Sequence, residues 1–251
     1  MIHFVGAGCG APDLITVRGK KYIETADVII YAGSLVNREL LQYAKKECAL
    51  YDSAKMTLEE IIEVIAAAEK KGLATVRLHT GDPSLYGAIG EQMQELERLG
   101  LEYDITPGVS AFSGAAAALK AEYTQPGGSQ TVIITRAAGR TGVPVAEDLR
   151  SLASHGATMV LFLSTGLLDK VSADLIAGGY DADTPAAIVY KASWKDEKVC
   201  RCTVGTLKQT AEANGIAKTA LVAVGDFLKG SVSRSKLYDP GFSTEFREAE
   251  K

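Results

Sequence analysis

Short apolar runs alternate with longer amphipathic stretches along the first half of the chain. The runs Ile2–Val5 and Thr75–Leu78 are rich in branched residues and predict buried strands. Between them, Leu58–Glu69 carries apolar residues at helical spacing among glutamates, with Gly72 just beyond as a stop signal. The other elements predicted in this half are helices from Thr16 to Thr25, Gly87–Arg98 and Ala115–Leu119, and strands Asp27–Tyr31 and Tyr103–Ile105. This alternation is typical of an α/β protein.

The segment Tyr123–Ser129, with its Gln-Pro-Gly-Gly sequence, is the clearest break in the chain, and a second α/β series follows it. Strands Ala186–Val189 and Val199–Val204 come in direct succession, which predicts a hairpin and hence a mixed sheet. The remaining predicted elements are strands Thr131–Thr135, Thr158–Leu163 and Ala220–Val224 and helices Val145–Leu152, Leu168–Ile176 and Leu207–Ala213. We therefore expect two α/β domains, residues 1–115 and 116–251.

Composition and charge narrow the function classes. The chain has 251 residues, of which 47% are hydrophobic and 23% charged, as in an ordinary globular protein. A net charge of -4 argues against a nucleic-acid partner, which would demand a basic surface. The apolar runs are too short to span a membrane. The sequence enters a strand at Ile2 without a signal-peptide pattern, so we expect a cytoplasmic protein without a membrane partner.

The four cysteines do not form a recognisable metal motif. Cys200 and Cys202 make a C-x-C on a predicted strand, where both side chains point to one face. Zinc sites more often have C-x2-C spacing and a second pair of ligands, which Cys9 and Cys48 do not supply. Packing against the strand is the better interpretation, and no metal site is expected.

A glycine-rich loop, Gly6–Gly10, follows the first predicted strand and suggests a dinucleotide-binding turn. In that fingerprint the helix opens inside the loop and an acidic residue ends the second strand. Here Pro12 and Asp13 interrupt, and Asp27 precedes the second strand. A nicotinamide- or flavin-dependent oxidoreductase is therefore a weaker alternative, as is a non-catalytic α/β binding module. The loop is either a tight turn or a place where a large flat ligand approaches the backbone.

Four segments, taken in order and spacing, resemble the tetrapyrrole (corrin/porphyrin) methylases. They are Gly-x-Gly-x-Gly-x-Pro-Asp-Leu-x-Thr (Gly6–Thr16), Ala-Asp-Val-Ile-x-Tyr (Ala26–Tyr31), Gly-Asp-Pro-Ser-Leu-Tyr-Gly (Gly81–Gly87) and Pro-Gly-Val-Ser-Ala (Pro107–Ala111). The resemblance reaches to about Phe227, although Cys9 stands where the family commonly has proline. It implies S-adenosyl-L-methionine as methyl donor and two α/β domains with the cofactor in a cleft between them.

Three segments resemble one branch of this family, whose members methylate carbon 11 of precorrin-4 or cobalt-precorrin-4. These are Tyr31–Val36, His79–Gly87 and Thr135–Pro144, and Ala32 stands where the sirohaem branch has an acidic residue. The resemblance implies methylation of that ring carbon in cobalamin biosynthesis, with the metal state of the tetrapyrrole open. Another step on a precorrin or on uroporphyrinogen is the alternative. We also expect a homodimer.

The resemblance implies a set of cofactor contacts, most of them at the ends of predicted strands. Asp82 could accept hydrogen bonds from the ribose hydroxyls or the amine, or could merely form an Asx turn. For the apolar members, core packing is the competing interpretation. The predicted contacts are Pro12, Gly81, Asp82, Leu85, Ser110, Ala111, Leu163, Ala192 and Ala220.

The tetrapyrrole substrate carries many carboxylates, which arginine pairs with well. Of four arginines on or near candidate loops, Arg18, Arg38, Arg136 and Arg140, the last two flank a glycine and are the favoured pair. The predicted substrate contacts are Gly8, Gly10, Tyr31, Arg136 and Arg140. No catalytic residue is assigned; His79 could transfer a proton, but a hydrogen-bonded strand histidine is the preferred interpretation.

Overall fold

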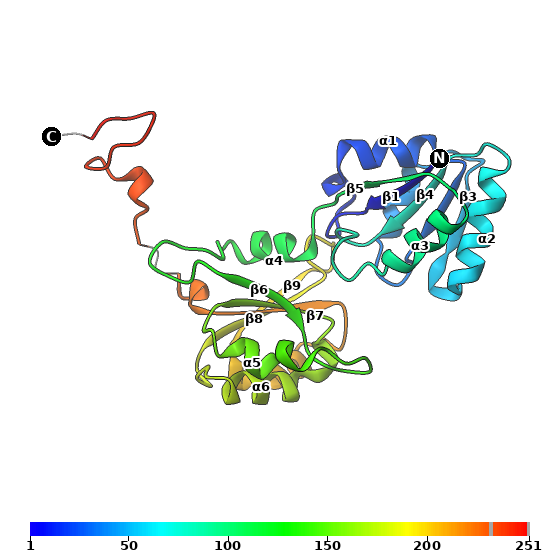
Figure 1. The fold of residues 1–251 in the computed structure, drawn as a ribbon. Coiled ribbons are helices and arrows are strands. Elements are labelled where there is room, and N and C mark those ends of the chain that lie inside the picture. Colours follow the sequence, from blue (N-terminus) through cyan, green and yellow to red (C-terminus); the bar gives the residue numbers. More distant parts are fainter. Residues whose placement is uncertain (231–232, 250–251) are drawn as a thin grey trace. The chain divides into compact units, whose positions relative to one another are not determined.

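The computed structural model describes residues 1–230 and 233–249, and the chain forms two compact units. The first unit comprises Met1–Gly114 together with Lys191–Glu197, and the second comprises Ala115–Tyr190 and Lys198–Lys251. Each unit is built on its own five-stranded sheet (Figure 1). The first unit therefore differs from the predicted range 1–115 by including a segment that lies far along the chain.

The sheet of the first unit is entirely parallel and has the order β3-β2-β4-β1-β5. Its strands are β1 (Ile2–Gly6), β2 (Val28–Tyr31), β3 (Ala49–Asp52), β4 (Thr75–His79) and β5 (Tyr103–Thr106). The α-helices are α1 (Val17–Thr25), α2 (Leu58–Glu69) and α3 (Gly90–Arg98), and short 3-10 helices cover Pro12–Leu14, Arg38–Tyr43 and Ser53–Lys55. All five strands thus end at the same edge of this sheet.

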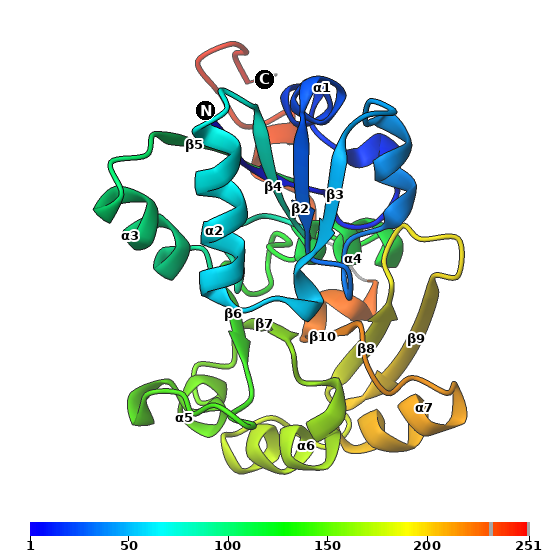
Figure 2. The same ribbon diagram turned by 90° about the vertical axis from the view of Figure 1, so that its right-hand side faces the viewer.

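Alternate residues of each inner strand enter two separate cores, because helices lie on both faces of the sheet (Figures 1 and 2). Phe4 packs in the cluster that includes α2 and α3, whereas Val5 packs in the cluster that includes α1. The helix starts follow the sequence: Thr16 caps α1, and Thr57 with Glu60 forms a capping box at α2.

The sheet of the second unit is mixed, with the order β6-β7-β10-β8-β9. Its strands are β6 (Val132–Arg136), β7 (Thr158–Phe162), β8 (Pro185–Tyr190), β9 (Lys198–Thr203) and β10 (Ala220–Val224). Helix α4 (Ala111–Leu119) contains the boundary between the units, and α5 (Leu149–Ala153), α6 (Leu168–Ala177) and α7 (Leu207–Ala213) follow. Strands β8 and β9 pair antiparallel, which confirms the predicted hairpin.

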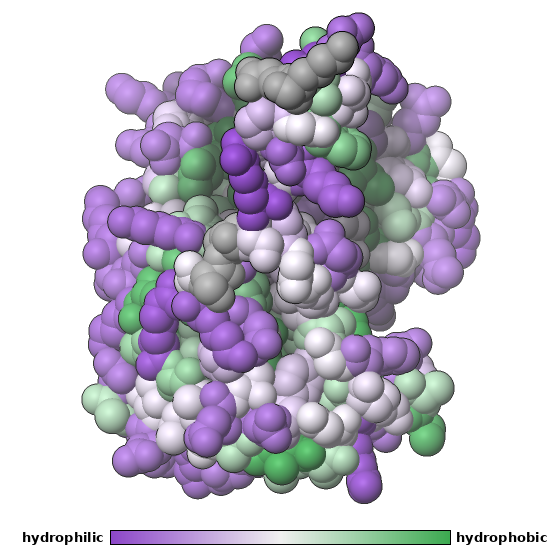
Figure 3. All heavy atoms as spheres, turned by 90° about the vertical axis from the view of Figure 1, so that its left-hand side faces the viewer, coloured by the Kyte–Doolittle hydropathy of each residue, from purple (hydrophilic) through white to green (hydrophobic). Residues whose placement is uncertain are grey.

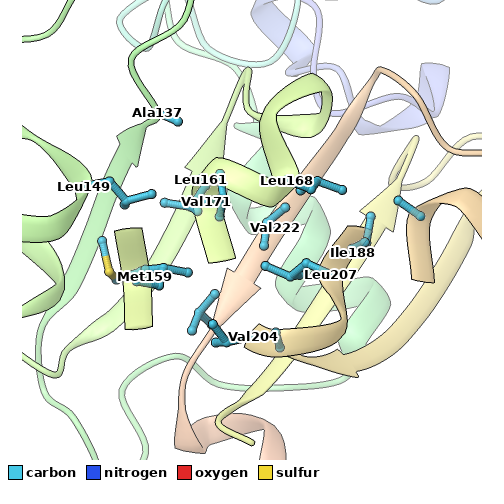
Figure 4. Close-up of a cluster of buried hydrophobic side chains, with 14 of the residues drawn as sticks. Ala137, Leu149, Met159, Leu161, Leu168, Val171, Ile188, Val204, Leu207 and Val222 are labelled. Atoms are coloured by element: carbon cyan, nitrogen blue, oxygen red, sulfur yellow. The ribbon is translucent and has the colours of Figure 1, made fainter. Parts of the chain in front are cut away.

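The core of the second unit lies between this sheet and helices α5, α6 and α7 (Figure 4). Leu161, Ile188 and Val222 from three strands meet Val171 and Leu207 from the helices. The predicted packing role of the C-x-C pair is confirmed, because Cys200 and Cys202 lie against this core. All four cysteines are free thiols.

Several elements differ from those predicted. Strand β3 was missed because Leu50 and Tyr51 are exposed on this edge strand and give no buried pattern. Helix α3 starts at Gly90 instead of Gly87, since Ala88 has a positive φ of 50°. The range Val145–Leu152 divides into a 3-10 turn and α5, and α4 begins at Ala111, four residues early.

The surface is mostly hydrophilic where Figure 3 displays it, with hydrophobic residues scattered between hydrophilic ones. Across residues 1–230 and 233–249, the structure contains no helix with the length and apolar character that crossing a membrane requires.

Candidate functional site

The carboxyl ends of β1, β4 and β5 lead into loops that pack backbone against backbone. A Cβ atom on Gly108 would overlap the carbonyl oxygen of Gly81, and one on Gly6 would lie 2.5 Å from the Gly108 nitrogen. Gly8 and Gly81 also exchange two backbone hydrogen bonds, of 3.2 Å and 2.9 Å. The glycines of three predicted motifs therefore form one closely packed cluster, which we call the glycine junction (Gly6, Gly8, Gly81, Gly108). Ligands of α/β proteins bind at such strand ends.

Asp82 links two of these loops through its carboxylate. Its Oδ2 accepts a 2.8 Å hydrogen bond from the Gly108 N–H, and its Oδ1 accepts one from the Ser84 N–H at 2.9 Å and another from the Ser84 hydroxyl. Burial raises the pKa of Asp82, but the hydrogen bonds from Ser84 and Gly108 outweigh it and lower the pKa below its usual value. The Asx turn that was the competing interpretation of Asp82 is present, and the same carboxylate also holds the loop after β5.

The other cofactor contacts predicted in this unit lie within a few residues of a junction glycine along the sequence. Ser110 is buried and its carbonyl accepts the Gly114 N–H in the first turn of α4, which includes Ala111. Leu85 is half-buried and directly precedes Tyr86, whose φ is 57°. Non-glycine residues with positive φ are strained and often lie at ligand sites. Pro12 starts a short 3-10 helix beyond the first glycine loop.

The glycine-rich loop is covered by the chain's own atoms. A Cβ on Gly10 would overlap the Trp194 indole and lie 2.5 Å from the carbonyl oxygen of Ala192, while one on Gly8 would lie 2.9 Å from the Leu14 carbonyl oxygen. On these sides the missing side chains make room for the chain's own atoms, as the tight-turn interpretation expects. Substrate binding by Gly8 and Gly10 stays a prediction.

The segment Lys191–Glu197 supplies this cover, and the sequence interpretation missed it. The Ser193 hydroxyl accepts the Ala11 N–H at 2.9 Å and lies 3.4 Å from the Cys9 sulfur. Ala192 was expected to contribute from the C-terminal domain, but it belongs to the first unit together with this segment. Its contact with the cofactor stays a prediction.

Tyr31 ends β2 and packs in the cluster around α1. Only 8% of its surface is exposed, so the ring offers little area to a macrocycle. Its register partner on β3 is Asp52.

In the second unit, two predicted cofactor contacts come together at one end of the sheet. Leu163 follows β7, has a φ of 52° and is 63% exposed, an unusual combination for an apolar residue. Ala220 starts β10, and its carbonyl accepts a 3.0 Å hydrogen bond from the buried Thr165 hydroxyl. Strands β7 and β10 are antiparallel neighbours, which explains the proximity. A strained, exposed leucine is consistent with a ligand contact.

The two arginines predicted to bind substrate carboxylates, Arg136 and Arg140, differ in their surroundings. Arg136 donates from Nη1 to the Thr141 carbonyl at 3.2 Å and from Nη2 to the Gly142 carbonyl at 2.6 Å, so it closes its own loop. Arg140, on that loop, is exposed. Arg136 therefore has less capacity for a substrate carboxylate than the sequence suggested.

Comparison with known proteins shows which family this chain belongs to. The family of tetrapyrrole (corrin/porphyrin) methylases matches residues 1–208. The chain belongs to this family. A cobalt-precorrin-4 C(11)-methyltransferase from Methanocaldococcus jannaschii is 54% identical over 100% of this chain and 97% of its own. A precorrin-4 C(11)-methyltransferase from Pseudomonas aeruginosa is 43% identical, over 96% and 99% of the two chains. The X-ray structure of a cobalt precorrin-4 methyltransferase shares 47% identity and a TM-score of 0.89, covering 90% of this chain and 95% of that one.

This tetrapyrrole methylase has two buried polar residues under the candidate site. His79 ends β4 and is 4% exposed, and its Nε2 has no hydrogen-bond partner among the residues that the structure describes. The expected hydrogen bond of this strand histidine is thus missing at Nε2. Arg77, two residues earlier, donates from Nε to the Gln92 side chain at 2.9 Å and from Nη1 to the Ile30 carbonyl at 3.2 Å. Burial lowers the pKa of Arg77 to about 10.

The environment of His79 predicts a loss of stability in acid. Desolvation, with a smaller contribution from the Arg77 charge, lowers the pKa of His79 to about 3 in the folded chain. Unfolded histidine titrates near 6.5, so between about pH 6.5 and 3 the unfolded state binds a proton that the folded state does not. The free energy of unfolding should fall by about 2 kcal/mol between pH 7.5 and 5 from this group.

Urea unfolding at these two pH values measures the effect. His79→Leu should abolish that part of the pH dependence, whereas His155→Gln, at an exposed position, should retain it. An unchanged pH dependence in His79→Leu would show that His79 titrates normally when folded.

Proposed function

We propose that the chain transfers a methyl group from S-adenosyl-L-methionine to carbon 11 of cobalt-precorrin-4 or its metal-free counterpart, in cobalamin biosynthesis. The observation that carries the proposal is the 54% identity, over the whole chain, to a relative named for that reaction. A cytoplasmic homodimer is part of the proposal and is predicted from the sequence.

The residues around the glycine junction fit the proposed cofactor. A carboxylate has about four acceptor positions, and Asp82 uses three of them for Gly108 and Ser84. Because Asp82 is only half-buried, the remaining position can accept a hydrogen bond from a ribose hydroxyl or an amine. Around the junction, the apolar contacts Leu85 and Ala111 suit an adenine ring or an aliphatic chain. Leu163 and Ala220 of the second unit are kept as proposed contacts on the strength of the family resemblance. We retain Pro12, Gly81, Ser110 and Ala192 in the proposed set.

Methyl transfer requires the protein mainly to position the two reactants. Bound S-adenosyl-L-methionine would supply an electrophilic methyl group: its methyl–sulfur bond would break as the bond to the electron-rich ring carbon forms in line with it, with the neutral thioether as leaving group. The chain's contribution is to hold the two reactants in that alignment and to exclude water. A rigid junction of three loops is suited to this task, since small misplacements reduce the rate greatly. No side chain of the described site is required as a dedicated base for the transfer itself.

Transfer of a labelled methyl group tests the proposal directly. Purified chain, labelled S-adenosyl-L-methionine and either precorrin-4 or cobalt-precorrin-4 should yield a product one methyl group heavier, with the label on carbon 11 by NMR. Label on a different ring carbon would replace the reaction with another step of the family. Tight cofactor binding with no transfer to any tetrapyrrole would favour a binding module instead.

A further inference from the structure

Asp52, at the end of β3, holds its carboxylate in one fixed position. Oδ1 accepts the Gly33 N–H at 3.1 Å and the Ala54 N–H at 3.0 Å. A Cβ atom on Gly33 would overlap the Asp52 carboxylate, so this close approach requires glycine. Asp52 is the register partner of Tyr31, the residue before Ala32, so it places an acidic group beside the end of β2.

The fixed carboxylate holds an arginine that faces solvent. Arg38 starts the 3-10 helix Arg38–Tyr43, and its Nη2 donates to Asp52 Oδ2 at 3.2 Å. The guanidinium carbon lies 5.8 Å from the centroid of the Tyr31 ring, within the range of a cation–π contact. The Arg38 side chain is nevertheless 66% exposed. Among the described residues, Asp52 is the only hydrogen-bond partner of this guanidinium, so most of its five N–H donors are available.

This arrangement differs from an ordinary surface ion pair. Exposed pairs contribute about 1 kcal/mol or less and need no glycine or aromatic support. Arg98 provides the comparison: it pairs with Glu95 within one helix and its side chain is also 66% exposed, but no aromatic ring of residues 1–230 or 233–249 lies beneath it. Arg136 has fewer N–H groups available to a ligand than Arg38, because its terminal nitrogens donate to carbonyls of its own loop.

Arg38 lies on the same sheet edge as the glycine junction. The loop that follows β2 is tied to the end of β4, because the Ala32 N–H donates to the Leu78 carbonyl at 3.2 Å and the Thr80 hydroxyl to the Leu35 carbonyl at 3.3 Å. Thr80 directly precedes Gly81. A ligand whose reacting carbon lies near the junction and whose carboxylates extend several ångströms outward could therefore reach the β2–β3 end of this edge.

We propose that Arg38, positioned by Asp52 and supported by the Tyr31 ring, binds a peripheral carboxylate of the tetrapyrrole substrate. The inference rests on the proposed function and adds a specificity-determining residue to it. A planar guanidinium with free N–H groups matches a carboxylate in two-point geometry, which a lysine ammonium cannot reproduce. Asp52 acts through Arg38 and is a positioning residue.

Steady-state kinetics with separately varied substrates test this proposal. Arg38→Ala should raise the KM for the tetrapyrrole about tenfold or more while the Kd for S-adenosyl-L-methionine, from calorimetry, stays unchanged. Arg38→Lys should recover part of the loss, and Asp52→Asn should raise the KM by a smaller factor. The matched control Arg98→Ala should leave both constants at the wild-type value.

Three results would overturn the proposal. An unchanged KM in Arg38→Ala would exclude the contact, and an equal KM rise in Arg98→Ala would indicate a non-specific charge effect. An equal weakening of cofactor and tetrapyrrole binding in Arg38→Ala would indicate a structural role. In each case an active wild-type enzyme would leave the methyl-transfer proposal standing, whereas a wild type inactive on every tetrapyrrole would contradict that proposal itself.

Discussion

Gly108→Ala should destabilise the first unit by about 3 kcal/mol, the value expected for forcing a methyl group into a packed interior. The new Cβ would overlap the carbonyl oxygen of Gly81 and press on the Gly6 backbone, and neither group can move without breaking the Gly8–Gly81 pairing. Denaturant unfolding followed by circular dichroism measures the change. Methyl transfer should fall as well, because the loop after β5 would be displaced.

Gly90→Ala is the matched control for this substitution. Gly90 starts α3 in the same unit, and a Cβ atom there would meet nothing within 4 Å. Alanine is a better helix former than glycine by about 1 kcal/mol, so this variant should be as stable as the wild type or slightly more stable. If Gly108→Ala retained wild-type stability, the three loops would have to be far less rigidly packed than the structure shows.

Asp82→Ala should lower the affinity for S-adenosyl-L-methionine by at least about tenfold, as measured by calorimetry. The substitution removes an acceptor proposed for the cofactor, and it also releases the Gly108 N–H that fixes the loop after β5. Loss of one charge-assisted hydrogen bond corresponds to about 1.5–3 kcal/mol, or roughly a tenfold to hundredfold change in affinity.

Two further variants show whether this effect is specific. Asp82→Asn keeps the size of the side chain and an acceptor for one partner, so its affinity should lie between those of Asp82→Ala and the wild type. Glu63→Ala removes an exposed carboxylate from α2 and should leave the affinity unchanged. Wild-type affinity in a folded Asp82→Ala protein would exclude Asp82 from the cofactor site.

The sequence predicted most of the fold because buried elements carry a periodic apolar pattern. β4 has five buried residues in succession, and α2 has apolar residues at helical spacing between its capping box and Gly72. The pattern fails where burial is absent, as in the exposed edge strand β3. It also fails where local strain sets a boundary, as at Ala88 before α3.

The candidate site was predicted less completely, since its geometry depends on contacts between distant segments. The motifs containing Gly6, Gly81 and Gly108 could be identified, but the sequence does not show that these glycines face one another. Trp194 gave no signal because the residue that it covers, Gly10, lies far away in sequence. Asp52 was missed with its strand; a polar residue that ends an apolar edge strand is the signal that could have revealed it.

The late segment Lys191–Glu197 has a consequence for the order in which the protein forms during synthesis. A domain that emerges early from the ribosome generally folds before the rest of the chain is made. Here the first unit can assemble its sheet once β5 has emerged, but Gly10 remains without its cover until residues 115–190 have been added and Trp194 follows. The nascent chain would therefore expose the Gly10 side of its glycine-rich loop throughout synthesis of most of the second unit. A fragment ending at Gly114 would retain that exposure permanently.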